Sequence, residues 1–146
     1  MHTRTVKVED LSVQEFLPFG CSLLEHLADP GSTLRSREAA ATAVGMMPLS
    51  TNLADLLPAL LQDRERQVVE AAARSAGAIG SEPMLRLLVE QLGRQEGRLA
   101  ARQAFLTRGD EIIPMLMECM REPSLPMSIR RHIPSLLGAI GSERAV

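Results

Sequence analysis

A six-residue motif occurs twice in the chain, and this repeat limits the possible folds more than any other feature. The sequence Gly-Ala-Ile-Gly-Ser-Glu occupies residues 77–82 and recurs unchanged at residues 138–143. The copies lie 61 positions apart, close to two units of about 30 residues, and repeat arrays have periods of about 20–50 residues. The motif therefore predicts an array of similar units, an architecture that offers extended binding surfaces to partners.

Four segments of the chain align with the residues around this motif at nearly constant spacing. They are residues 36–47, 68–80, 98–109 and 129–141. A second set of apolar, helix-like segments precedes them: residues 13–27, 53–61, 84–92 and 112–120. Turn-forming residues lie between the two segments of each unit, so we expect each unit to be a helix, a turn and a helix.

The chain is therefore predicted to be a single all-α domain over residues 1–146. We expect about four repeats, with approximate bounds at residues 12–47, 53–80, 82–109 and 111–141. Residues 142–146 read as the start of a further repeat. Terminal repeats normally carry a polar cap, which these residues lack, so we expect the domain to work as part of a larger polypeptide or complex.

The motif itself reads as the end of one helix followed by the start of the next. Gly80 and Gly141 stand where a left-handed C-terminal cap is expected. Ser81 and Ser142 follow as N-terminal caps, each with a glutamate in the next helical turn. No strand precedes the motif, so a phosphate-binding glycine loop is not supported. Three prolines inside the helical patterns are predicted to bend their helices: Pro58, Pro114 and Pro134.

Composition argues against several classes of protein. The formal net charge is −2 and there is no long basic run, whereas a nucleic-acid surface needs clustered basic residues. The longest apolar stretches are shorter than the roughly 18 residues of a membrane span, and the N-terminus lacks the apolar stretch of a signal peptide. Cys21 and Cys119 lie far apart in apolar contexts, which favours buried reduced thiols over a disulfide or a metal pair. These features predict a cytoplasmic protein.

The repeated segments resemble HEAT repeats. Residues 68–80 and 129–141 match the family pattern Val/Ile-Arg-x-Ala-Ala-Ala-x-Ala-Leu-Gly-x-Ile-Gly closely, and residues 36–47 and 98–109 match it more loosely. The resemblance covers most of the chain and implies a right-handed α-solenoid. Residues 129–134 are also similar to HEAT units attached to bacterial transporter-like proteins of the nucleotide-translocase type. That similarity would make the domain a cytoplasmic module of a membrane protein.

The resemblance also implies a polar ladder between stacked units. In the family, an Asp in the turn between the helices pairs with an Arg that opens the second helix. The residues of this chain that match those positions are Asp29, Arg37, Asp63, Arg98 and Arg130. The second unit has Val69 at the Arg position, where Arg66 could take its place, and the fourth has Glu122 instead of Asp. We therefore expect an incomplete ladder.

In the family, the second helices of the units line one face of the solenoid. Two columns of equivalent positions run along these helices: Glu38, Glu70, Leu99 and Arg131 in one, and Thr42, Arg74, Gln103 and Ser135 in the other. A mixed polar surface of this kind is solvated or meets a protein surface of mixed charge. The predicted partner-binding residues are Glu38, Thr42, Glu70, Arg74, Gln103, Arg131 and Ser135.

No catalytic set or metal-binding cluster is evident in the sequence. His2, His26 and His132 are dispersed, and none has a further ligand at metal-binding spacing. We therefore predict a non-catalytic scaffold or regulatory module, without a cofactor, that binds another protein or an adjacent domain. The alternative is an enzyme built on HEAT-like repeats, such as a bilin lyase or an alkyl-base DNA glycosylase. The glycosylase would need aromatic stacking residues, and the chain has no Trp or Tyr.

Overall fold

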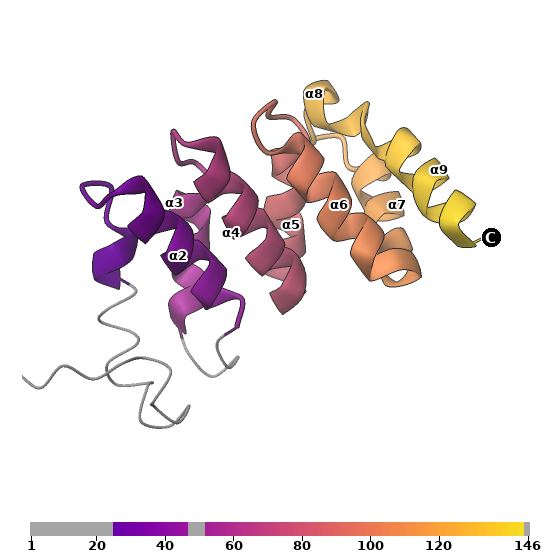
Figure 1. The fold of residues 1–146 in the computed structure, drawn as a ribbon. Coiled ribbons are helices and arrows are strands. Elements are labelled where there is room, and N and C mark those ends of the chain that lie inside the picture. Colours follow the sequence, from indigo (N-terminus) through magenta and orange to yellow (C-terminus); the bar gives the residue numbers. More distant parts are fainter. Residues whose placement is uncertain (1–24, 47–51, 145–146) are drawn as a thin grey trace, which may run out of the picture.

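The structure is a computed structural model that describes residues 25–46 and 52–144 (Figure 1). Every regular element in these two ranges is helical, and neither range contains a strand. After a helical stretch at residues 25–28, the elements are α2 (Leu34–Val44), η2 (Asn52–Leu56), α3 (Leu57–Leu60), α4 (Arg66–Ile79), α5 (Glu82–Gln91), α6 (Arg98–Arg108), η3 (Gly109–Ile112), α7 (Ile113–Arg121), α8 (Met127–Arg130) and α9 (Ile133–Arg144). The prediction of an all-α domain is confirmed.

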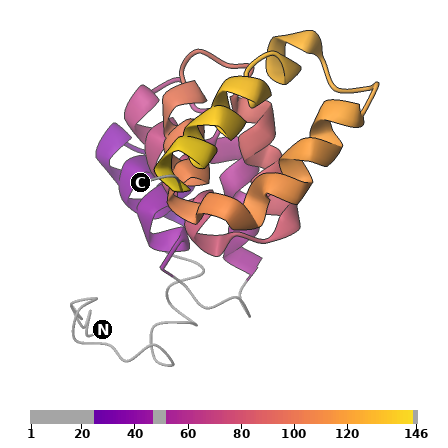
Figure 2. The same ribbon diagram turned by 90° about the vertical axis from the view of Figure 1, so that its right-hand side faces the viewer.

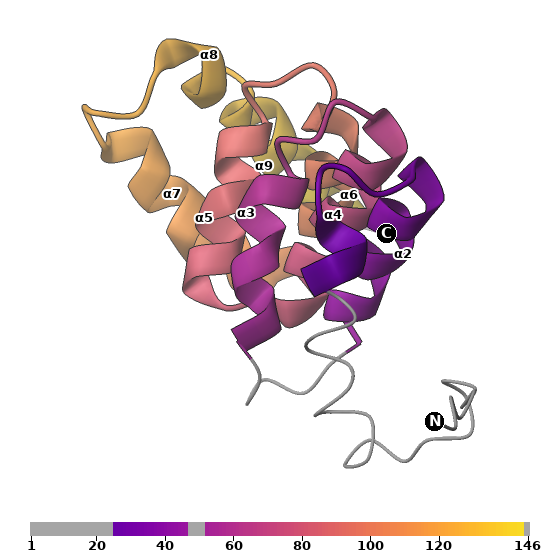
Figure 3. The same cartoon turned by 90° about the vertical axis from the view of Figure 1, so that its left-hand side faces the viewer.

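The helices lie in two layers, seen edge-on in Figures 2 and 3. We call α2, α4, α6 and α9 the front layer, because they face the viewer in Figure 1, and α3, α5 and α7 the back layer. Within the front layer, α4 packs against both α2 and α6, and α6 packs against α9. The back-layer helices pack against the front layer: α3 against α4, α5 against α4 and α6, and α7 against α9.

Apolar side chains between the two layers form one continuous core. Leu57, Leu60 and Leu88 come from the back layer and are fully buried, or nearly so. They meet a front layer that is rich in buried alanine, such as the run at residues 71–73. Phe105 is the largest apolar side chain in this core. The core between the closely packed helices is therefore mainly aliphatic.

Small residues allow the front-layer helices to approach closely. A Cβ added at Gly45 would lie 2.6 Å from the Ser75 Oγ atom, and Ser75 is buried where its hydroxyl donates to the Ala41 carbonyl. A Cβ added at Gly77 would lie 2.8 Å from the Ala104 Cβ atom. The same kind of contact therefore joins α2 to α4 and α4 to α6.

The predicted helix boundaries agree best in the middle of the chain. The segments predicted at residues 68–80 and 98–109 are α4 and α6, each within two residues at both ends. The predicted helix at residues 13–27 lies mostly outside the described residues. The segment predicted as one helix at residues 129–141 is instead split between α8 and α9.

The prolines begin helices rather than bend them, so that prediction is wrong. Pro58, Pro114 and Pro134 each occupy the second position of an α-helix. Proline is tolerated there because the first N–H groups of a helix have no partner within it. A 3₁₀ segment precedes Pro58 and Pro114, and a turn at residues 131–132 precedes Pro134. Each proline therefore interrupts a longer helical segment by making a new start.

The two copies of the repeated motif differ in structure. Gly80 ends α4 in the left-handed conformation, with φ of 66°, and its N–H donates to the Ala76 carbonyl at 3.0 Å. This confirms the predicted helix end at the first copy. Gly141, however, lies inside α9, which continues to Arg144, so the predicted helix end at the second copy is wrong. Residues 142–144, predicted to open a further repeat, extend α9.

Candidate interaction surface

The predicted ladder contains one ion pair, between the first and second units. The Arg37 Nε atom lies 2.8 Å from the Asp63 Oδ2 atom, and the two side chains are only 2% and 9% exposed. Arg37 also donates to the Ser32 carbonyl in the turn before its own helix. Because a buried charge is tolerated when it is paired and hydrogen-bonded, this arginine fixes two successive turns relative to each other.

The other ladder arginines bind backbone carbonyls instead of carboxylates. Arg98 donates from Nε to the Leu92 carbonyl at 2.8 Å, and Arg130 donates to the Leu125 carbonyl at 2.8 Å. Asp29 accepts from the Gly31 N–H group at 2.7 Å and so stabilises its own turn. The recurring feature is therefore an arginine that closes the turn of its own unit, and only Arg37 adds a carboxylate partner from the next unit.

The second unit is completed by a residue that the sequence pattern did not indicate. Arg66, the expected substitute at this unit, instead faces Glu70 on the surface at 3.4 Å. Arg94, from the turn of the third unit, donates to the Leu61 carbonyl of the second unit's turn. An arginine from the following unit thus supplies the donor that Val69 cannot.

The predicted partner-binding residues all lie on the front layer or at its edge. Thr42, Arg74, Gln103, Arg131 and Ser135 are exposed, and Leu99 in the same columns is 58% exposed. Glu38 and Glu70 are half-buried, and Glu70 is engaged by Arg66.

Arg74 and Gln103 come together at a depression between α4 and α6. The depression has a volume of about 320 Å³, and its other lining residues are Gly77, Ala78, Ala104 and Thr107. The small residues that permit the close approach of the helices thus also form an apolar floor with a polar rim. This combination of an apolar floor and a few convergent polar groups is typical of a binding site.

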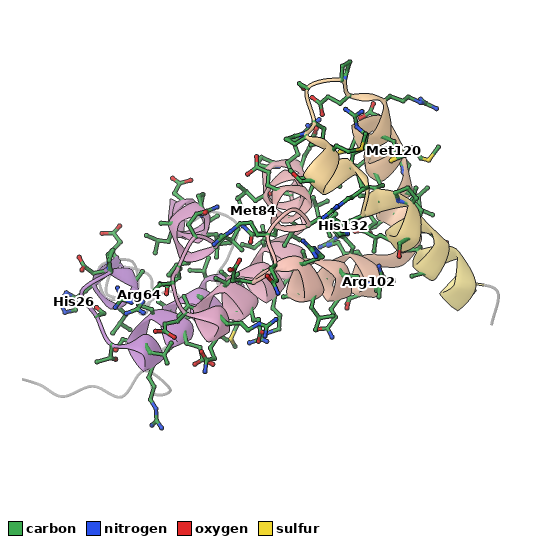
Figure 4. The ribbon with its side chains drawn as sticks, turned by 90° about the horizontal axis from the view of Figure 1, so that it is seen from above. His26, Arg64, Met84, Arg102, Met120 and His132 are labelled. Atoms are coloured by element: carbon green, nitrogen blue, oxygen red, sulfur yellow. The ribbon has the colours of Figure 1, made fainter. Side chains whose placement is uncertain are left out.

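Basic side chains gather where α6 meets α9. The Arg102 Nη1 atom lies 3.1 Å from the Ser135 Oγ atom, and Figure 4 shows Arg102 and His132 on these neighbouring segments. The Nε2 atom of His132 is buried and has no hydrogen-bond partner among the described residues. Burial lowers the pKa of His132, and the positive charges of Arg98 and Arg131 lower it further.

A larger groove lies on the other side of the molecule, between α5 and α7. It has a volume of about 670 Å³ and is lined by methionine, leucine and isoleucine together with carboxylates from Glu82, Glu111 and Glu118. Two of these carboxylates are already paired, since Glu82 lies 3.5 Å from Arg86 and Glu111 contacts Arg108. The predicted columns do not include this back-layer groove.

No protein-family model matches this chain. A search of curated proteins and a search of solved structures likewise found no match. The assignment of the surface therefore rests on the geometry of the chain itself.

The described residues offer few groups suited to catalysis or metal binding. Cys119 is 3% exposed and forms no disulfide, and burial raises the pKa of its thiol. Cys21 and His2 lie outside the described residues. Across the described ranges, His, Cys, Asp and Glu side chains form no group of three that could hold a metal ion. None of the helices in those ranges is both long and apolar enough to cross a membrane.

Sequence reasoning missed Arg94, Arg102 and Arg108. Their only signal in the sequence is an excess of arginine over lysine, because the chain has 16 basic residues of which a single one is lysine. Arginine's planar group can donate several hydrogen bonds at once, which suits it to binding carbonyl groups at helix ends and turns. That use explains Arg94 and Arg108, which donate to the carbonyl groups of Leu61, Gly77 and Ala78. These partners could not be located without the fold.

Proposed function

We propose that this chain is a HEAT-like repeat module, a right-handed α-solenoid, that binds a protein partner or an adjacent domain through its front layer. The module acts as a scaffold or regulatory element and carries out no catalysis. The unpaired, buried thiol of Cys119 is compatible with a reducing compartment such as the cytoplasm.

One observation carries this proposal. Two of the residues chosen from equivalent positions of the repeats, Arg74 and Gln103, line a single depression with an apolar floor. Exposed residues continue on either side of it, with Thr42 on α2 and Ser135 on α9. A binding surface that extends over several units is the usual use of a repeat array, because each unit adds equivalent positions.

Site-specific photo-crosslinking tests the proposal. A photoreactive amino acid is placed at Thr42, Arg74 or Gln103 in the full chain, expressed in its native cells. Control positions on the back layer are Arg86 and Glu118, which are also exposed. We expect a discrete adduct of one common partner from the front-layer positions alone. Equal adduct formation from both layers, or adducts from the back layer only, would refute the assignment of the front layer.

A further inference from the structure

We infer that the junction of α6 and α9 binds a carboxylate-rich segment of a partner protein. The basic seam, as we call this junction, consists of Arg98 and Arg102 on α6 and of Arg131 and His132 in the turn before α9. This inference rests on the proposed function, because the seam is one part of the front layer. It goes beyond that function by specifying that the partner segment is acidic.

The seam contains cations without an internal counter-ion. Arg98, Arg102 and Arg131 make no ion pair with a carboxylate in the described part of the chain; Arg98 is held by the Leu92 carbonyl and Arg102 by the Ser135 hydroxyl. By contrast, the other end of the front layer has Asp63 paired with Arg37 and Glu70 paired with Arg66. The positive charges of the seam therefore repel one another, and an anion supplied by a partner would reduce this repulsion.

Three glutamates of this half of the chain lie on the back-layer side. Glu111, Glu118 and Glu122 belong to η3, α7 and the turn after α7, on the back-layer side. Glu96, in the turn before α6, pairs with none of the arginines. Glu111 and Glu122 are engaged by Arg108 and Arg86, so they do not neutralise the seam, and its arginines give it a positive local potential.

The backbone adds to this potential. Arg98 is the first residue of α6, and His132 immediately precedes α9. The N-termini of two neighbouring helices therefore lie beside the same side chains, and each carries a partial positive charge. The α6 N-terminus has no side-chain cap. By contrast, the Thr33 side chain caps the N-terminus of α2.

The neighbouring apolar residues favour a peptide over a nucleic acid. Leu99, next to Arg98, is 58% exposed, and Met127, one helical turn before Arg131, is 66% exposed. An acidic segment with apolar side chains would cover both while its carboxylates meet the arginines. A nucleic acid would need aromatic stacking surfaces or a longer basic track, and the single Phe among the described residues, Phe105, is fully buried.

Fluorescence anisotropy of a labelled peptide tests the inference with the full chain. The probe is a short glutamate-rich peptide with leucines at helical spacing, and the control probe replaces each glutamate with lysine. We expect saturable binding of the acidic probe only, weakened as the salt concentration rises from about 50 mM to about 500 mM. The double variant Arg102→Glu/Arg131→Glu should weaken binding about tenfold or more, because it places like charges opposite each other.

Two further variants separate the seam from net charge and from loss of fold. Arg35→Glu/Arg64→Glu changes the net charge equally at two exposed arginines that lie outside the seam, and it should leave binding nearly unchanged. Ser135→Asp keeps every arginine and adds a carboxylate beside Arg102, so it should compete with the probe. Circular dichroism verifies that each variant remains helical.

Three results would overturn the inference. The first is no binding of the acidic probe, and the second is an equal loss of probe binding in the two double variants. The third is binding of a single-stranded oligothymidine that is tighter than binding of the acidic probe and is abolished in Arg102→Glu/Arg131→Glu. The last result would identify a nucleic-acid site. A failure here is distinguishable from failure of the proposed function. If front-layer crosslinking succeeds while the acidic probe fails, the scaffold stands and only the acidic partner is rejected.

Discussion

Replacing Gly77 by alanine tests the close contact between α4 and α6 with an internal control. Gly77 and Gly138 are the same residue in the two copies of the repeated motif, and both lie within α-helices. An added Cβ at Gly77 would lie 2.8 Å from the Ala104 Cβ atom, whereas an added Cβ at Gly138 would meet no atom within 4 Å. The two substitutions are chemically identical and differ in their surroundings.

The magnitude follows from two opposing terms. Alanine in place of glycine in a helix interior stabilises the helix by about 1 kcal/mol at either site. At Gly77 the overpacking against Ala104 costs about 1–3 kcal/mol, because the two helices must separate or the backbone must shift. Gly138→Ala should therefore raise the free energy of unfolding by about 1 kcal/mol. The free energy of unfolding of Gly77→Ala should be about 1–3 kcal/mol below that of Gly138→Ala, because the gain in helix propensity is the same in both variants.

Urea unfolding followed by circular dichroism measures both free energies. The double variant Gly77→Ala/Ala104→Gly gives a further check, because it removes the added contact from the opposite side. The double variant should lose less free energy of unfolding than the sum of the losses in Gly77→Ala and Ala104→Gly, as expected for residues in direct contact. If Gly77→Ala proved as stable as Gly138→Ala, or if the double variant showed no coupling, the close approach of α4 and α6 would be refuted.

The remaining predictions concern Arg37, His132 and Cys119. Arg37→Ala should lower the free energy of unfolding by about 3–5 kcal/mol, because it leaves a buried carboxylate unpaired; the exposed neighbour variant Arg35→Ala should change it by less than about 0.5 kcal/mol, and equal effects would contradict the ion pair. The lowered pKa of His132 means that below about pH 6.5 the unfolded chain binds a proton that the native state resists. The free energy of unfolding should then fall as the pH decreases through the native pKa of His132. In urea titrations between about pH 7 and pH 5, the free energy of unfolding of the His132→Asn variant should change less with pH. In a Cys21→Ser variant, a thiol reagent should modify Cys119 slowly in the native state and rapidly in urea, because burial hides the sulfur and raises its pKa; rapid native modification would show that Cys119 is accessible.

Local signals in the sequence were sufficient for the middle of the fold. α4 and α6 have strong helical patterns, and Gly80 ends α4 in the left-handed conformation that glycine favours at helix ends. The resemblance to HEAT repeats assigned Arg37 and Asp63 to a polar ladder, and these two side chains form an ion pair. These features depend on short stretches of chain or on a pairing between adjacent turns.

Features that depend on distant parts of the chain could not be predicted. The role of Arg94 requires the turn of the third unit to lie beside Leu61 of the second. The basic seam requires α6 and α9 to be neighbours, and it also requires the segment at residues 129–141 to be broken before Pro134. A helical pattern alone does not show whether a proline bends a helix or begins a new one, because the answer depends on the packing of both halves.

The two copies of the motif differ in conformation and also in their tertiary contacts. At the first copy, Arg108 of the following unit donates from Nε to the Gly77 carbonyl at 2.6 Å and from Nη2 to the Ala78 carbonyl at 3.3 Å. These are among the last carbonyls of α4, which lack partners within the helix, and a cation there is also favoured by the helix dipole. The helix therefore ends at Gly80. Around the second copy, a Cβ added at Gly141 would meet no atom within 4 Å, and α9 continues through the same six residues. The motif permits a helix end, and one forms at the copy whose last carbonyls accept hydrogen bonds from Arg108.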